Sequence, residues 1–454
     1  MKHKFYRYLL LTFNKKTILT IYILSIIIGY YFLNALGNDV LISSVFLLYS
    51  YRACLVLLFL SFARDLVIRD KFSYPILIPL SAFCLLIPIS LKLSPMPTQH
   101  YQLVAYIHLL FCTYIAFTAS LDCGNKKFAK WFQVISLLTI ILLLVVNIIS
   151  LLFYYCIVHH ISLPGYLQEK AGNYILQGNG HTFLSNGQSF RYVGLFFGIS
   201  DTAYSNICGI LLTGYLLDNK KINRLYGIVS ILLGLIMIYL SDSRTGYLLL
   251  GIVLIAAIYR IFLYFFSKKT ANLIGIILVI VVIFSCVLFG IHLFQIIQGL
   301  NPEEQISYLD SISSGRITMW EIALDSFKKS PITGMGYYHP FTYPNSKRVF
   351  YHYHNLFLTL LAQTGLVGTG LFCAFLVMTC WKLIKNRHLI MKKHAFWLLV
   401  LVITEFANSL NEWTLIADEW RLITIFFWIC LGYLVFLDVK RKRPENDNGE
   451  KIVQ

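Results

Sequence analysis

The chain has 454 residues, of which 58% are hydrophobic and only 13% are charged. Charged residues make up about a quarter of a typical soluble domain. This composition therefore excludes a single water-soluble globule, and the high apolar content also excludes a disordered chain. The mean hydropathy of +0.69 indicates a protein of the lipid bilayer. Aromatic residues make up 16% of the chain, which fits many membrane spans with aromatic belts at both interfaces.

Apolar runs that are long enough to cross the bilayer occur about twelve times along the chain. Lipid offers no hydrogen-bond partners to the backbone, so these spans must be helical. We therefore predict an all-α, polytopic integral membrane protein with about 12 transmembrane helices. The predicted spans are residues 17–36, 40–63, 74–91, 101–121, 131–158, 192–217, 225–240, 245–266, 271–297, 355–381, 395–410 and 421–437.

The chain is strongly basic, with 38 Lys and Arg against 21 Asp and Glu and a formal net charge of +17. Most of the basic residues lie at the two termini and in alternate loops between the predicted spans, which is the positive-inside pattern. We therefore expect a multi-pass protein of the plasma membrane with both termini in the cytoplasm. No basic domain lies outside the spans, so the charge indicates topology, and no nucleic-acid partner is predicted.

Two loops are long, and this topology places both on the extracytoplasmic face, where long loops commonly carry function. The first, at about 159–191, is rich in Gly and Asn and is expected to be irregular. The second, at about 298–354, is expected to contain a helix over residues 313–330 that ends at Pro331. The predicted organisation is a cytoplasmic N-terminus (1–16), five spans (17–158), spans six to nine with the first outer loop (159–297), the large outer loop (298–354), three spans (355–437) and a cytoplasmic basic tail (438–454).

Arginines on the outer face run against the topology bias, so each needs a physical reason. Arg191 opens the sixth span, Arg244 lies between spans seven and eight, and Arg316 begins the predicted outer helix. One arginine side chain can donate two hydrogen bonds to a phosphate group, and it stays charged. Three arginines at one site would therefore suit a lipid-linked diphosphate. Each could instead anchor a helix end or pair with a nearby carboxylate, as Asp242 could with Arg244. Arg52, deeper in span two, is either a functional residue or the partner of a buried acid.

His352 and His354 lie where the large outer loop enters span ten. A histidine can take a proton near neutral pH, so either residue is a candidate general base. They could instead serve as polar caps of the span. Their i,i+2 spacing is compatible with a metal site, but no carboxylate or cysteine accompanies them nearby in the sequence. We therefore predict no metal and no cofactor.

The motifs of the second half follow a particular order. An R-x-x-G begins a middle span, S-R-T-G follows a short outer turn, R-x-x-x-W opens the outer helix, and P-x-x-G-x-G and H-N come before a glycine-bearing span. This order resembles the O-antigen ligase and O-antigen polymerase family over about residues 191–370. One departure is the segment 198–201, Gly-Ile-Ser-Asp, where the family often shows Pro-Asn. The matching positions are Arg191 and Gly194, residues 243–246, Arg316 and Trp320, Pro331, Gly334 and Gly336, His354 and Asn355, and Gly365 and Gly368.

The resemblance implies a membrane glycosyltransferase of GT-C-like architecture that uses a polyprenyl-diphosphate-linked oligosaccharide. It implies that Arg191, Arg244 and Arg316 bind the diphosphate, and Arg52 is a further candidate for this role because of its position within a span. Arg244 and Arg316 would also act in catalysis together with His354, for which His352 is the substitute candidate. The sequence has neither a DxD motif nor a Rossmann-type glycine motif, as a nucleotide-sugar enzyme would need.

Three functions remain open on the sequence. The favoured one is a polysaccharide polymerase of the O-antigen, capsule or exopolysaccharide type, which transfers the glycan to a lipid-linked acceptor with inversion. A flippase and a chain-length regulator would be partners in its pathway. A ligase would use a different acceptor at the same site. A lipid-linked oligosaccharide flippase is the alternative from another class, but transporters place their ionisable groups near the middle of the bundle.

Overall fold

The computed structural model describes residues 15–25, 74–94, 102, 105–106, 109–123, 125–159, 161, 176–183, 189–196, 198–299, 301–313, 315–342, 349–412, 415 and 422–439. These residues are mostly helical, in agreement with the prediction of a helical membrane protein. The predicted span at 40–63, Arg52 within it, and residues 440–454 of the basic tail lie outside the described residues.

Four helices are long and apolar enough to cross a membrane, counted over the described residues only. They are Lys126–Val158, Arg224–Ser241, Arg244–Phe265 and Leu356–Lys392. Shorter apolar helices accompany them at Leu77–Leu93, Phe396–Ser409 and Leu422–Val435. The chain is therefore an integral membrane protein, whereas the total of twelve spans and the GT-C-like architecture stay predictions.

Outside the large outer loop, each described helix overlaps a predicted span. The helix of the tenth span continues to Lys392, beyond the predicted end at 381, and the helix of the sixth span begins only at Ile199, because Tyr192 ends a strand. The helices are α2 (Lys15–Ser25), α5 (Leu77–Leu93), the π-helical turn η3 (Phe111–Ile115) with α7 (Ala116–Cys123), α8 (Asn125–Val158), α10 (Ile199–Asp218), α11 (Arg224–Ser241), α12 (Arg244–Phe265), α13 (Lys268–Gln298), α16 (Leu356–Lys392), α17 (Phe396–Ser409) and α18 (Leu422–Val435).

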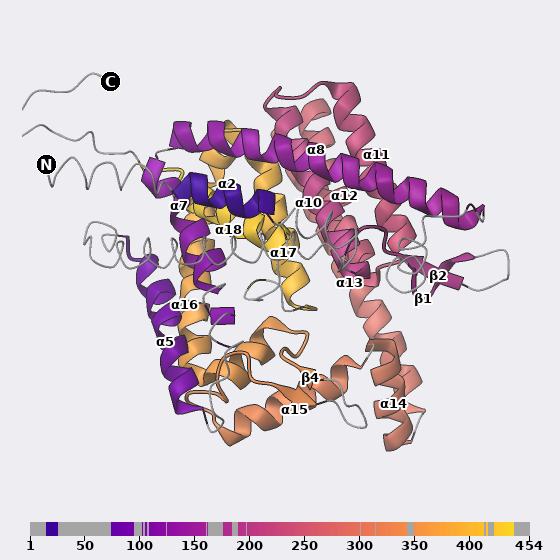
Figure 1. Cartoon of the computed structure of the whole chain (residues 1–454), viewed down its shortest axis with the longest axis vertical. Helices are drawn as coiled ribbons and strands as arrows, with labels where there is room; N and C mark the ends of the chain where they lie inside the picture. Colours follow the sequence, from indigo (N-terminus) through magenta and orange to yellow (C-terminus); the bar gives the residue numbers. More distant parts are fainter. Residues whose placement is uncertain are drawn as a thin grey trace, which may run out of the picture.

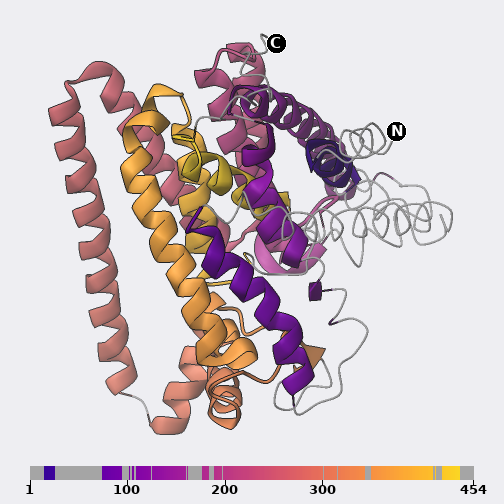
Figure 2. The same cartoon turned by 90° about the vertical axis from the view of Figure 1, so that its left-hand side faces the viewer.

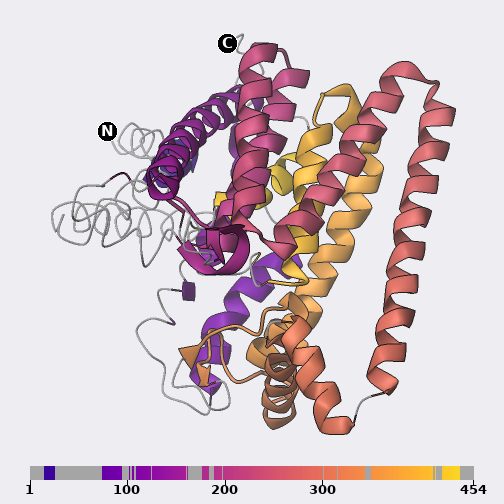
Figure 3. The same cartoon turned by 90° about the vertical axis from the view of Figure 1, so that its right-hand side faces the viewer.

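The core of the bundle lies around α10 and α18, which are buried on almost every side. A helix that is apolar all round belongs either in a protein core or in lipid. On α12 and α13 many of the described large apolar side chains are exposed instead; Ile280 and Phe284 of α13 are 58% and 61% exposed. Figures 2 and 3 show α12 and α13 as a long hairpin at one side of the molecule, with α13 outermost. Lipid is the solvent that such a surface requires.

The basic loops gather at one end of the molecule. Asn219, after α10, donates a hydrogen bond to the carbonyl of His394 between α16 and α17 at 3.2 Å. Lys382 of α16 pairs with Asp438, after α18, at 2.8 Å. The turns that the charge pattern assigned to one side of the membrane therefore lie together. Helix α8 crosses the other helices near this end, and α14 and α15 lie at the opposite end (Figure 1).

The large outer loop is more structured than expected. The predicted helix is present as α15 (Arg316–Lys329), and a second helix, α14 (Pro302–Ser313), precedes it. Pro302 suits the first position of α14 because a helix has no acceptor for the N–H there. A short hairpin of β3 (Phe341–Thr342) and β4 (Val349–Phe350) follows α15.

The expectation of an irregular first loop was wrong for the part of this loop that the structure describes. Strands β1 (Leu176–Phe183) and β2 (Ser189–Tyr192) pair in an antiparallel hairpin. The register shifts between Gln177 and Thr182, across the glycine-bearing part of β1. Glycines within a strand often mark such a bulge, so a Gly- and Asn-rich segment can still form a strand. The two small sheets are the departure from an all-α chain.

Helix α16 is broken at Gly365, which has φ 63° and ψ −165°. The break frees backbone groups of the helix, and the loop after α15 satisfies them. The N–H of Met335 donates to the carbonyl of Ala362 at 2.8 Å, and the N–H of Leu366 donates to the carbonyl of Pro331 at 2.8 Å. The P-x-x-G-x-G segment therefore attaches the outer loop to α16, which fixes the position of α15 at this end of the bundle.

Candidate active site

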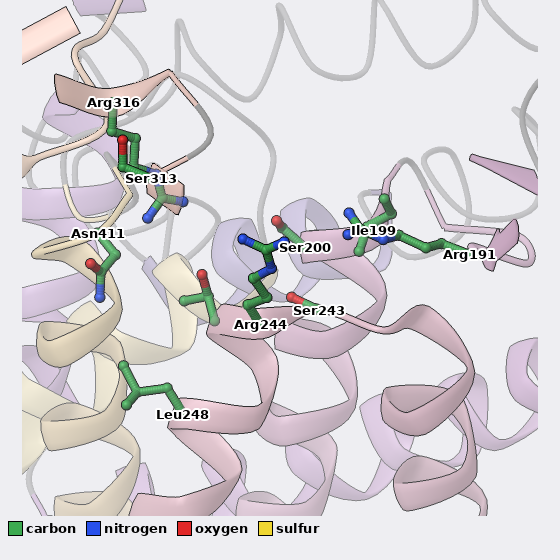
Figure 4. A pocket seen from close by; sticks show the side chains of 10 residues that line it. Arg191, Ile199, Ser200, Ser243, Arg244, Leu248, Ser313, Arg316 and Asn411 are labelled. Atoms are coloured by element: carbon green, nitrogen blue, oxygen red, sulfur yellow. The ribbon is translucent and has the colours of Figure 1, made fainter. Parts of the chain in front are cut away.

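One pocket of about 440 Å³ collects residues from five parts of the chain. They are the end of β2, the first turns of α10 and α12, the α14–α15 junction, and the segment after α17. Figure 4 shows Arg244 in the middle, with Arg316 on one side and Arg191 on the other. The lining residues are Arg191, Ile199, Ser200, Ser243, Arg244, Thr245, Leu248, Ser313, Arg316 and Asn411.

Arg191 reaches the pocket from strand β2, and the turn that follows is held against α8. Gly194 has φ 65°, and a Cβ there would lie 2.7 Å from the Oγ of Ser150. The hydroxyl of Tyr192 donates to the Ser150 carbonyl, and the N–H of Leu195 donates to the Ser150 Oγ at 3.1 Å. The glycine of the R-x-x-G motif therefore permits the close turn that positions Arg191.

Arg244 is the first residue of α12, and the S-R-T-G motif builds the start of that helix. The Oγ of Ser243 accepts a hydrogen bond from the N–H of Gly246 at 3.1 Å, which is an N-cap. A Cβ at Gly246 would lie 2.6 Å from the Cβ of Ala203, so this glycine lets α12 pack closely on α10. The helix start and its arginine are thereby held beside the arginine of β2.

Arg316 is the first residue of α15, after Gly315 in the left-handed conformation at φ 83°. The Oγ of Ser313, at the end of α14, accepts from the N–H of Ile317 at 3.4 Å, while the N-cap position of α15 is Gly315, which has no side-chain cap. The Nη2 of Arg316 lies 2.7 Å from the Oε1 of Glu412, a carboxylate that is 8% exposed. Glu412 therefore holds the Arg316 guanidinium in place, and Arg316 also lines the pocket.

Three helix N-termini border the pocket, since α10, α12 and α15 all begin there. The first turn of a helix presents unpaired N–H groups and a partial positive charge, which together attract anions. Three guanidinium groups add full positive charge. Asp242 offsets part of it, with its Oδ2 3.7 Å from the Nε of Arg191. The pocket is therefore suited to an anion with several oxygens.

The two histidines lie beside this pocket. His354 has φ 49°, a conformation that non-glycine residues seldom adopt, and its Nδ1 lies 2.8 Å from the Oε2 of Glu412. The rings of His352 and His354 are 4.4 Å apart between centroids and cross at 68°. Glu412 thus contacts both Arg316 and His354, which joins the histidine pair to the pocket through one carboxylate.

Residues 229–373 match the family model described as O-antigen ligase. The chain carries an O-antigen ligase domain. No curated protein matches the chain. The family assignment predicted from the motif order is confirmed, and it supports a membrane enzyme that transfers glycans from lipid-linked oligosaccharides.

The O-antigen ligase domain extends from α11 into α16 and includes Arg244, Arg316 and His354. Arg191 precedes the matched segment, and Glu412 follows it. Glu412 is the residue that sequence reasoning missed. Its only signal was a carboxylate directly after a predicted span, on the side of the large outer loop.

The structure brings together five of the six predicted site residues. Arg52 lies outside the described residues, so its predicted place with the others stays a prediction. Asp242 was considered as a partner of Arg244, and the structure shows an ion pair between Asp242 and Arg191. Within the described ranges, no group of three His, Cys, Asp or Glu side chains is arranged to hold a metal ion.

Proposed function

We propose that the protein is a polysaccharide polymerase. It transfers a glycan from a polyprenyl diphosphate carrier to a lipid-linked acceptor at the extracytoplasmic face of the plasma membrane. The observation that carries the proposal is the convergence of Arg191, Arg244 and Arg316 on one pocket at which three helices begin. A diphosphate has enough oxygens for guanidinium groups to bind it through two hydrogen bonds each.

The pocket supplies charge where the reaction needs it. As the glycosidic bond breaks, negative charge grows on the diphosphate, and fixed positive groups around it lower the barrier. Leu248, one turn into α12, lines the same pocket and is 54% exposed. An apolar border at this point suits a substrate whose phosphate enters the pocket while its prenyl chain stays in lipid.

The acceptor hydroxyl attacks the anomeric carbon from the side opposite the diphosphate, so we expect inversion at that carbon. Its proton passes to His354, with His352 as the substitute. The new bond is formed between the acceptor oxygen and the anomeric carbon, and the lipid diphosphate leaves with the electron pair of the broken bond.

The membrane orientation is part of the proposal. The pocket lies at the end opposite the contacts Asn219–His394 and Lys382–Asp438, and those turns hold the basic residues of the positive-inside pattern. With that basic end in the cytoplasm, the pocket opens to the outer face. Both termini are then cytoplasmic. A flippase and a chain-length regulator would be pathway partners.

The decisive experiment uses the purified protein with lipid-linked repeat units as both donor and acceptor. Longer glycans support the polymerase. Transfer only to a different acceptor supports the ligase, and lipid movement without transfer supports the flippase. Arg244→Ala is expected to slow transfer by about 10²-fold, because it removes charge that stabilises the transition state.

Arg260→Ala is the matched control, since Arg260 lies on the same helix but pairs with Asp218 at the opposite end, at 2.9 Å. We expect it to keep nearly full activity. Unchanged polymer length and yield with Arg244→Ala, at equal protein level, would overturn the role of the pocket.

A further inference from the structure

Glu412 is shared between the anion pocket and the histidine pair. Its Oε1 lies 2.7 Å from Arg316, and its Oε2 lies 2.8 Å from His354. The carboxylate is 8% exposed, so both contacts are largely shielded from water. A buried carboxylate needs such partners, and each of the two oxygens of Glu412 has one here.

The second contact fixes the proton position on His354. The close guanidinium of Arg316 keeps the Glu412 carboxylate ionised, and an ionised carboxylate can only accept hydrogen bonds. The Nδ1 of His354 must therefore carry the hydrogen that it shares with Glu412. In the neutral ring this leaves Nε2 with a free lone pair, which is the form a general base requires.

We infer that Glu412 is a positioning residue for glycan transfer, which holds His354 in the Nδ1–H tautomer and ties it to the diphosphate pocket through Arg316. The inference rests on the proposed function. The acceptor O–H gives its proton to Nε2 as its oxygen bonds to the anomeric carbon. The positive imidazolium that results lies against the Glu412 carboxylate, which stabilises it until the proton passes to water.

Through this arrangement a histidine and an arginine from distant parts of the chain act together. Arg316 starts α15, His354 precedes α16, and Glu412 follows α17. The Glu412 carboxylate orients both the base, His354, and the pocket residue Arg316. A misplaced base costs rate even when the substrate binds normally.

The test compares the wild-type protein with Glu412→Gln, which keeps the size of the side chain and removes its charge. We expect kcat to fall by about 10²-fold or more, with a much smaller change in the KM of the lipid donor. The exposed Glu321→Gln on α15 is the matched control and should behave as the wild type. Glu412→Asp keeps the charge but is shorter, and its rate should lie between the two.

A double-mutant comparison separates positioning from a structural role. In a His354→Ala background, Glu412→Gln should cost less than about tenfold, because its main effect passes through that ring.

These experiments distinguish a failure of the positioning role from a failure of the proposed function. If the wild-type protein transfers no glycan, the proposed function fails. If the wild type is active and Glu412→Gln matches it in kcat, the positioning role fails alone. A full loss from Glu412→Gln that persists in the His354→Ala background also overturns it. Should Glu412→Gln fail to fold, the rate of Glu412→Asp decides, and a wild-type rate there would contradict the inference.

Discussion

Gly334 and Gly365 lie backbone against backbone, where the loop after α15 meets the break in α16. A Cβ at Gly334 would lie 2.3 Å from the carbonyl carbon of Gln363, and one at Gly365 would lie 2.3 Å from the carbonyl oxygen of Ile332. Both glycines also have positive φ, at 73° and 63°. No side chain fits between the two segments, so this contact depends on glycine at both positions.

Gly365→Ala should destabilise the protein strongly. The positive φ and the clash with backbone together cost about 2–4 kcal/mol. Thermal unfolding in detergent measures the loss. Gly370→Ala in the same helix is the control, because a Cβ there meets nothing within 4 Å. The control should be neutral or stabilised by up to about 1 kcal/mol; equal unfolding temperatures for both variants would contradict the explanation.

His354→Ala and His352→Ala should differ in activity. His354 contacts Glu412 at 2.8 Å, so its loss should lower transfer by about 10²–10⁴-fold. His352 packs against that ring and should matter less, within about tenfold, through its support of the ring position. Initial rates with lipid-linked substrate provide the comparison. Two fully active variants would remove histidine from the reaction.

Asn355 links the start of α16 to the end of α17. Its Oδ1 accepts from the N–H of Leu358 at 3.0 Å, and its Nδ2 donates to the carbonyl of Leu410 at 2.8 Å. Asn355→Ala loses both contacts and should cost about 1–2 kcal/mol of stability. It should also lower activity, because Leu410 leads directly to the segment with Glu412.

Asn355→Asp separates the two contacts, since a carboxylate can cap the helix but cannot donate to Leu410. We expect it to unfold at a temperature closer to the wild type than Asn355→Ala does, with a comparable loss of activity. Wild-type activity in Asn355→Asp would show that the Leu410 contact is dispensable.

Because of His339, in the outer loop, we expect the stability of the folded protein to depend on pH. Burial, together with the nearby charge of Lys329, lowers the pKa of His339 below its ordinary value. The unfolded chain therefore takes up a proton at about pH 6.5 while the folded protein resists it. The stabilisation from the neutral folded ring is present above about pH 6.5 and is lost as the pH falls below it.

Thermal unfolding at pH 7.5 and 5.5 tests this. The wild-type protein should lose more stability between these two pH values than His339→Asn, which cannot take up the proton. An equal loss in both proteins would show that other groups account for the pH dependence.

The sequence by itself determined the class of structure and the kind of chemistry. Apolar runs predicted helices because lipid forces each span to satisfy its own backbone. Arg191, Arg244 and Arg316 were identifiable because arginines on the outer face run against the positive-inside pattern and therefore need a reason. The hairpin at Leu176–Tyr192 was missed, because a Gly- and Asn-rich segment has little local strand signal and gains its order from pairing with a second strand.

Only the tertiary structure decided which distant residues meet. Nothing local in the sequence distinguishes Glu412 from an ordinary acid after a span, because its role arises from Arg316 and His354, which lie 96 and 58 positions away. The glycines of the P-x-x-G-x-G motif were visible in the sequence, but their task of locking the outer loop into the break of α16 was not. Close backbone approach and shared ion pairs are properties of packing, so they exist only once the helices are assembled.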